Sequence, residues 1–205
     1  MYLDYLCTII VIYYNLVYEK KYTIVGIDEA GRGPLAGPVV AASVIIDEKE
    51  LPEKINDSKK ISEKNRQSYY EVIIDKACQF GIGTVSPSEI DTINIHNATL
   101  KAMKISYEKL NCKDPKIYID GIYKPDICGD SYAIKHGDRL VPIISAASIL
   151  AKVTRDKIMM KIDEEFPMYD FKSHKGYPTK HHIEMIKKYG TCEYHRKTFK
   201  PIKLL

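Results

Sequence analysis

Short apolar segments with strand character alternate along this chain with longer segments of helical periodicity. The predicted strands cover residues 22–28, 39–46, 80–85, 116–120 and 132–135. The second of them, VVAASVII, is a continuous run of small and β-branched residues, which is typical of a strand buried on both faces. Because strands and helices alternate, we expect an α/β fold with a mixed central sheet flanked by helices.

Helices are predicted at residues 62–78, from Ser88 to about residue 110, at 145–166 and at 179–190. In the second of these, Leu100, Met103, Tyr107 and Leu110 recur at helical spacing and form one apolar face. We therefore divide the chain into an N-terminal extension of unknown role (1–21), a main domain (22–166) and a small C-terminal helical segment packed on that domain (167–205).

Composition and charge narrow the class of protein. The 31 Lys and Arg residues outnumber the 27 Asp and Glu residues, and the net charge of +4 permits a polyanionic partner without diagnosing one. Five cysteines are scattered with no C-x-x-C pair, which favours a reducing, cytoplasmic compartment over a disulfide framework or a zinc ribbon. The apolar run at 5–14 is shorter than the roughly 20 residues that a spanning helix needs, so we expect no membrane association.

Acidic residues stand at or just after the ends of three predicted strands. Asp28 and Glu29 are adjacent at the end of the first, Asp120 ends the fourth, and Asp138 follows the fifth. In an α/β sheet these positions border the crevice where ligands bind. Converging carboxylates repel one another, and a divalent cation is the direct compensation. Oxygen ligands suit Mg²⁺ or Mn²⁺, and two such ions about 4 Å apart form the arrangement used for phosphodiester hydrolysis.

A loop rich in glycine and proline, AGRGPLAGP, follows Asp28 and Glu29. Its glycines allow a close approach to a phosphate or a sugar, and Arg32 adds a fork of hydrogen-bond donors. The spacing G-x-G-x-x-x-G does not match a dinucleotide-binding fingerprint, and the loop lacks the Gly-Lys-Ser/Thr ending of a P-loop. A nucleotide-binding oxidoreductase is therefore disfavoured.

Four blocks, in order, resemble the ribonuclease HII (type 2 ribonuclease H) family. The first is GIDEAGRGPLAGPVVAA at 26–42, and the second is DSKK at 57–60. The third is SAASILAKVTRD at 145–156. The fourth, at 169–199, holds K-G-Y, a following histidine and H-R-x-[ST]-F. The resemblance covers about residues 22 to 200.

This resemblance implies an RNase H-like fold and a specific reaction. The expected activity is endonucleolytic cleavage of the RNA strand of RNA–DNA hybrids, with incision 5′ of single ribonucleotides embedded in duplex DNA. The products would carry 5′-phosphate and 3′-hydroxyl ends. The family's four metal-binding carboxylates fall on Asp28, Glu29, Asp120 and Asp138.

The resemblance also implies which residues read the substrate. The family's glycine-arginine-glycine element falls on Gly31, Arg32 and Gly33, and its junction-reading tyrosine falls on Tyr177. In the family these residues contact the ribonucleotide 2′-hydroxyl and the deoxyribose that follows it. The 2′-hydroxyl is the group by which a protein distinguishes RNA from DNA.

Several assignments stay open. Asp156, inside the predicted long helix, competes with Asp138 as the fourth carboxylate, and we favour Asp138 because it follows a strand in a Gly-Asp turn. Lys59 and Asn94 are candidates for contacts to DNA phosphates, against ordinary loop or helix roles. A non-catalytic hybrid-binding module on the same fold is the alternative function. The C-terminal tail shows no sliding-clamp motif, and we expect a monomer.

Overall fold

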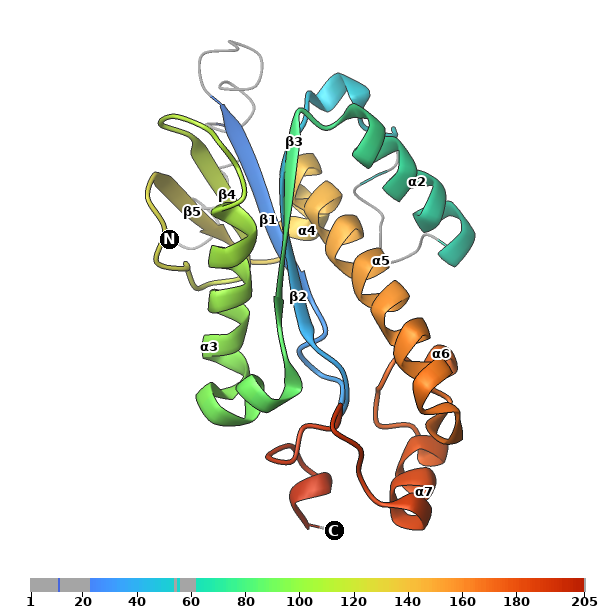
Figure 1. The fold of residues 1–205 in the computed structure, drawn as a ribbon. Helices are drawn as coiled ribbons and strands as arrows, with labels where there is room; N and C mark the ends of the chain where they lie inside the picture. The colour runs from blue at the N-terminus through green and yellow to red at the C-terminus, as the bar shows by residue number, and fades with distance from the viewer. Residues whose placement is uncertain (1–10, 12–22, 54, 56–61, 205) are drawn as a thin grey trace.

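The computed structural model describes residues 11, 23–53, 55 and 62–204. Its sheet has five strands: β1 (Ile24–Ala30), β2 (Val39–Ile45), β3 (Gln79–Val85), β4 (Lys116–Asp120) and β5 (Asp130–Ile134). They are ordered β3-β2-β1-β4-β5 (Figure 1). β1, β2 and β3 pair antiparallel, whereas β1, β4 and β5 pair parallel. The predicted α/β class with a mixed sheet is confirmed.

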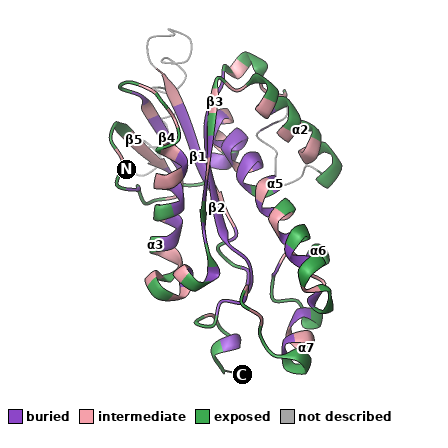
Figure 2. Cartoon of the chain, in the orientation of Figure 1, coloured by how far each residue is buried: buried purple, intermediate pink, exposed green. Residues whose placement is uncertain are grey.

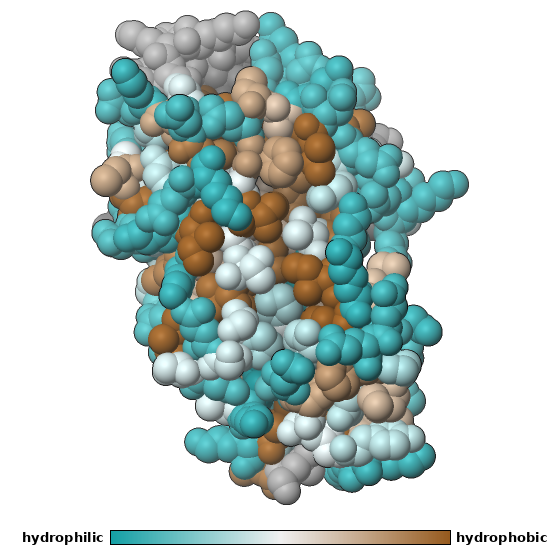
Figure 3. All heavy atoms as spheres, viewed as in Figure 1, coloured by the Kyte–Doolittle hydropathy of each residue, from teal (hydrophilic) through white to brown (hydrophobic). Residues whose placement is uncertain are grey.

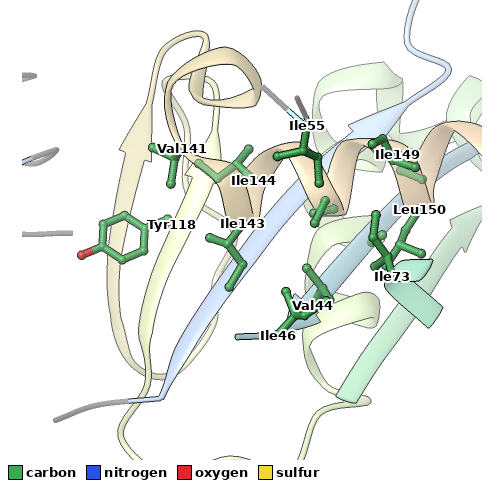
Figure 4. Close-up of a cluster of buried hydrophobic side chains, with 14 of the residues drawn as sticks. Val44, Ile46, Ile55, Ile73, Tyr118, Val141, Ile143, Ile144, Ile149 and Leu150 are labelled. Atoms are coloured by element: carbon green, nitrogen blue, oxygen red, sulfur yellow. The ribbon is translucent and has the colours of Figure 1, made fainter. Parts of the chain in front are cut away.

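Helices cover both faces of this sheet. α3 (Pro87–Tyr107) packs on one face, where Val25 and Ile27 of β1 join Ala98 and Ala102 in a buried cluster. α5 (Pro142–Glu165) packs on the other face together with α2 (Glu63–Lys76). Figure 4 shows this second cluster, with Val44 of β2 and Ile73 of α2 among its members. The buried residues of β1, β2 and α5 form the centre of the molecule (Figure 2).

The alternation of side chains along β1 sets up the acidic site. Val25 and Ile27 point toward α3, so Glu29 belongs to the α3 face and Asp28 to the α5 face. Pairing with β2 continues to Ala30, whereas pairing with β4 ends at Ile27. Asp28 and Glu29 therefore pair with β2 but lie beyond the last residue of β1 that pairs with β4. β1 ends at Ala30, two residues later than the sequence predicts, so both acids lie inside the strand.

The residues after α5 close over the loop that joins β1 and β2. They form the short helices Pro167–Tyr169 (η3), Phe171–His174 (α6) and Ile202–Leu204 (η4), and the longer helix α7 (Lys180–Tyr189). A third buried cluster joins Leu35 of the β1–β2 loop to Met159 of α5, Phe171 of α6 and Ile186 of α7. The boundary between the main domain and the C-terminal segment, which the sequence places after residue 166, stays a prediction.

Figure 3 shows hydrophobic residues in the middle of the face seen in Figure 1, bordered by hydrophilic ones.

Four features differ from the sequence expectations. α3 contains a kink at Asn94, whose φ of 66° is left-handed. Asp138 lies in a short helix, α4 (Gly137–Leu140), rather than in a simple turn, and a further short helix covers Glu48–Glu50 (η1). α5 begins three residues earlier than predicted because Pro142 occupies its first turn, where a missing N–H costs nothing. In the described part of the chain, no helix is long and apolar enough to cross a membrane.

Candidate active site

The structure brings the four predicted carboxylates to one cleft of about 820 Å³. Asp28 and Glu29 come from β1, Asp120 is the last residue of β4, and Asp138 comes from α4. Gly31, Arg32, Gly33 and Tyr177 line the same cleft. Residues far apart in the sequence therefore converge at the carboxyl ends of two parallel strands, where α/β folds bind ligands.

The environment of Asp28 disfavours its charged form. Its side chain is only 4% exposed, and its Oδ1 accepts the Glu29 N–H at 2.7 Å. Burial raises the pKa of Asp28 well above its ordinary value, and the nearby charges of Glu29 and Asp120 raise it further. Burial also raises the pKa of Glu29, although Arg32 Nη1, 3.3 Å from Glu29 Oε1, opposes that shift.

Asp138 is held against the other acids by its backbone. Its N–H donates to Asp120 Oδ1 at 3.4 Å, and its carbonyl oxygen accepts from the Ser145 hydroxyl at 2.7 Å. Asp156 lines the same cleft, but Lys175, Arg155 and Lys152 oppose the rise that burial causes in its pKa. Asp156 therefore lies near cationic side chains, whereas Asp138 lies beside the acid Asp120. This difference favours Asp138 as the fourth carboxylate of the predicted metal site.

The donor set fits a hard divalent cation. All four side chains offer carboxylate oxygens, which suit Mg²⁺ or Mn²⁺. Among the residues that the structure describes, no three carboxylate, imidazole or thiol groups are already drawn together as a cage. Burial and mutual repulsion raise the pKa values of Asp28 and Glu29, and Arg32 only partly opposes this at Glu29, so a divalent cation would relieve the repulsion if these side chains closed around it.

The glycine loop and the K-G-Y segment meet across the cleft. The Leu35 N–H donates to the Gly176 carbonyl at 2.8 Å. A Cβ on Gly33 would lie 3.7 Å from Tyr177 Cε1, so the loop and the tyrosine ring are neighbours. Gly31 has a φ of +95°, and a Cβ there would come within 2.2 Å of Arg155 Nε, so no larger residue fits. Tyr177 remains 49% exposed and available to a ligand.

Two buried arginines hold this loop, and neither is predicted from the sequence as a site-shaping residue. Arg155, 2% exposed, donates to the carbonyls of Pro38, Ala36 and Lys175, each at 3.0 Å. Arg196, fully buried, donates to the carbonyls of Gly31 (2.6 Å), Arg32 (3.0 Å) and Gly37 (2.8 and 3.0 Å). Burial lowers the pKa of Arg196 to about 9. The signal was present: both arginines lie inside the family blocks, in T-R-D and H-R-x-[ST]-F.

A chain of neutral histidines supports the backbone at Tyr177. His182 Nδ1 lies 2.9 Å from the Tyr177 carbonyl oxygen, which can only accept, so this nitrogen carries the proton. His182 Nε2 then accepts from His195 Nε2, 3.1 Å away. His195 Nδ1 in turn accepts the Cys192 N–H at 3.0 Å. His182 thus makes a specific contact with the backbone of the K-G-Y segment.

The two weaker candidates have different outcomes. Asn94 is exposed at the kink of α3, where its Oδ1 accepts the Asn97 N–H at 3.1 Å and caps the second part of the helix. Asn94 does not line the main cleft, so the structure gives it a helix-capping role and leaves its contact with substrate a prediction. Lys59 lies outside the described residues.

Comparison with known proteins agrees with this site. The family profile described as ribonuclease HII matches residues 25–202. Ribonuclease HII of Francisella philomiragia is 54% identical over 182 residues, which cover 89% of this chain and 98% of that protein. Ribonuclease HII of Acetivibrio thermocellus is 50% identical over 92% of this chain and 74% of that protein.

The fold matches as well. The ribonuclease H2 structure from Pyrococcus horikoshii superposes with a TM-score of 0.76 at 28% identity, and the match covers 89% of this chain and 96% of that one. The sequence match, the shared fold and the acidic cleft agree, and the chain belongs to the ribonuclease HII family, the type 2 ribonuclease H endonucleases that act on RNA–DNA hybrids.

Proposed function

We propose that this enzyme also incises duplex DNA 5′ of a single embedded ribonucleotide, leaving 5′-phosphate and 3′-hydroxyl ends, with two Mg²⁺ or Mn²⁺ ions. The observation that carries this proposal is the meeting of the glycine loop, Tyr177 and the four carboxylates in one cleft. A site that reads a single ribonucleotide needs contacts to its 2′-hydroxyl beside the reacting phosphate. The backbone of residues 31–33 lies beside Glu29 and can supply those contacts.

Each part of the cleft has its own task in this reaction. Asp28, Glu29, Asp120 and Asp138 would hold the divalent ions, which when bound activate a water for in-line attack and stabilise the leaving oxygen. The ring of Tyr177 would pack on the deoxyribose after the ribonucleotide and disfavour a second 2′-hydroxyl there. Arg155 and Arg196 are positioning residues, because they fix the carbonyls of the loop that reads the ribose.

The setting of this activity is part of the proposal. The four described cysteines, Cys78, Cys112, Cys128 and Cys192, are all free thiols, which supports a reducing compartment. We therefore expect the enzyme to act in the cytoplasm. We also expect it to be a monomer and to act on ribonucleotides left in replicated DNA.

A cleavage assay tests the proposal directly. The substrate is an end-labelled DNA duplex carrying one ribonucleotide, incubated with Mg²⁺, with Mn²⁺ or with chelator, and a continuous RNA–DNA hybrid is run beside it. We expect metal-dependent cutting 5′ of the ribonucleotide, reduced by about a thousandfold or more in Asp28→Asn.

The possible outcomes separate the alternatives. Cutting of the hybrid without cutting of the single-ribonucleotide duplex would keep the nuclease and remove the role given to Tyr177. Binding of both substrates without cutting of either would favour a non-catalytic hybrid-binding module.

A further inference from the structure

A second groove, of about 260 Å³, opens on the α3 face of the carboxylates. It shares Glu29, Arg32 and Asp120 with the main cleft. Its other walls come from α3, from the loop after β4 and from the residue after β5, and include Leu100, Met103, His96, Ile122, Tyr123 and Lys135. Tyr177 and the α5 side chains of the main cleft do not line it. The two cavities therefore extend from the same acids toward different elements.

The loop after β4 presents large apolar side chains to solvent at this groove. Ile122 is 61% exposed and Tyr123 is 54% exposed, although both directly follow the Asp120-Gly121 turn. The Tyr123 ring is oriented by an edge-on contact with His96, with ring centroids 4.5 Å apart and planes at 74°. One face of an ordered aromatic ring beside a polar site is a surface on which a nucleobase can stack.

The direction of the cleaved strand identifies the occupant of this groove. In the proposed reaction the glycine loop and Tyr177 contact the ribonucleotide and the deoxynucleotide after it, both downstream of the scissile phosphate. The strand must also continue upstream from the carboxylates. The groove begins at those carboxylates, and Arg32 and Lys135 provide positive charge for a phosphodiester backbone.

We propose that the groove between α3 and the loop after β4 binds the nucleotides upstream of the scissile phosphate, with one base stacked on Tyr123. This inference rests on the proposed function. It makes Tyr123 a substrate-binding residue of the cleaved strand, separate from the residues that read the ribonucleotide. Stacking tolerates any base, so the contact would add affinity without adding sequence preference.

The test combines a protein change with a substrate change. The wild type, Tyr123→Ala and Tyr123→Phe are assayed on the single-ribonucleotide duplex and on versions with an abasic deoxynucleotide one, two or three positions upstream of the cut. Tyr189→Ala, which removes a ring that is 49% exposed on α7 and lines neither cavity, is the matched control. Circular dichroism melts verify that each variant is folded.

We expect Tyr123→Ala to raise KM by about tenfold on the intact duplex, the size of one base–aromatic stack. Tyr123→Phe and Tyr189→Ala should match the wild type. At one upstream position the abasic duplex should raise the KM of the wild type by a similar factor but leave the KM of Tyr123→Ala unchanged, because the contact is already lost.

The failures are distinguishable. If the wild type cuts the single-ribonucleotide duplex and Tyr123→Ala has the same KM, the stacking site is overturned but the proposed function stands. The stacking site would also be overturned if the increase in KM caused by Tyr123→Ala multiplied with the increase caused by the abasic nucleotide at all three positions. In that case the ring and the bases would act independently. A wild type that cuts no single-ribonucleotide duplex would overturn the proposed function and this inference with it.

Discussion

Asp28 carries an electrostatic cost that its proposed role as a metal ligand would explain. The carboxyl group is buried, adjacent to Glu29 and near Asp120, and the Ser148 hydroxyl and the Glu29 N–H only partly offset these effects on its pKa. A residue chosen for stability alone would not be an ionisable group at this position. The cost is understandable if a cation completes the site, because active sites are where burial and like charges are tolerated.

The first residue-scale prediction concerns the stability of the metal-free protein. The raised pKa of Asp28 means that the folded state binds a proton more tightly than the unfolded state. The free energy of unfolding therefore falls as pH rises from about 4 through that raised pKa. We expect Asp28→Asn to melt at least about 2–4 °C higher than the wild type in chelator at pH 7.5, with the gap narrowing toward pH 4. Calorimetry across that pH range measures it, and an equal or lower melting point in the variant would contradict the clustering of charge.

The second residue-scale prediction concerns Arg196. Lysine keeps the charge but cannot reach three carbonyl groups with one ammonium group, so Arg196→Lys leaves buried acceptors unsatisfied. We expect a loss of about 1–3 kcal/mol in the free energy of unfolding. We also expect kcat/KM on the single-ribonucleotide duplex to fall at least about tenfold at a temperature where the variant is fully folded. Unchanged kcat/KM in a destabilised variant would limit Arg196 to a role in folding.

At the scale of elements, the sequence predicts what depends on local pattern. Apolar runs and helix caps locate the five strands and the main helices, and the acids near the carboxyl ends of β1 and β4 are found because acidic residues stand out at the end of an apolar run. The kink at Asn94 escapes prediction because its cause is one left-handed residue inside an otherwise helical pattern. The short helix α4 escapes for a similar reason, since four residues carry no periodicity.

The histidines that anchor α7 give the element-scale prediction. Burial lowers the pKa values of His182 and His195 to about 4, from ordinary values near 6.5. Below pH 6.5 the unfolded state gains protons that the folded state does not, so the free energy of unfolding falls as pH drops from about 6.5 to 4. Each histidine contributes on the order of 3 kcal/mol over this range.

The test removes one titrating group at a time. Urea unfolding of His182→Gln and of its parent is compared between pH 7 and pH 4.5, both in the Asp28→Asn background so that the acid of opposite sign does not offset the effect. We expect the variant to be less stable at pH 7 but to show a shallower decline toward acid. An identical pH dependence in the two proteins would mean that His182 is not buried in its neutral form.

At the scale of the whole molecule, the site is assembled from both ends of the described chain. Arg196, near the C-terminus, donates to the carbonyl of Gly31, which directly follows β1. Local sequence patterns carry no signal for such a contact, because a buried arginine without an acidic partner reads as a surface residue. From the sequence, only the resemblance at the fourth family block predicts that the C-terminal segment belongs to the site. The contacts by which Arg196 holds the glycine loop follow from the fold.

The charge of the cleft leads to the last prediction. Arg32, Arg66, Lys152, Lys172 and Lys175 all line it and are the cationic side chains that the phosphates of a bound duplex can contact. Each phosphate contact releases counterions and steepens the salt dependence of binding. In an Asp28→Asn background, where we expect cleavage to be lost, Lys175→Gln should reduce the slope of log K against log salt by about 1. Lys188→Gln, on α7 and outside the cleft lining, should leave it unchanged. Fluorescence anisotropy with a labelled hybrid measures both, and equal slopes in the two variants would show that the hybrid does not contact Lys175, whatever its affinity.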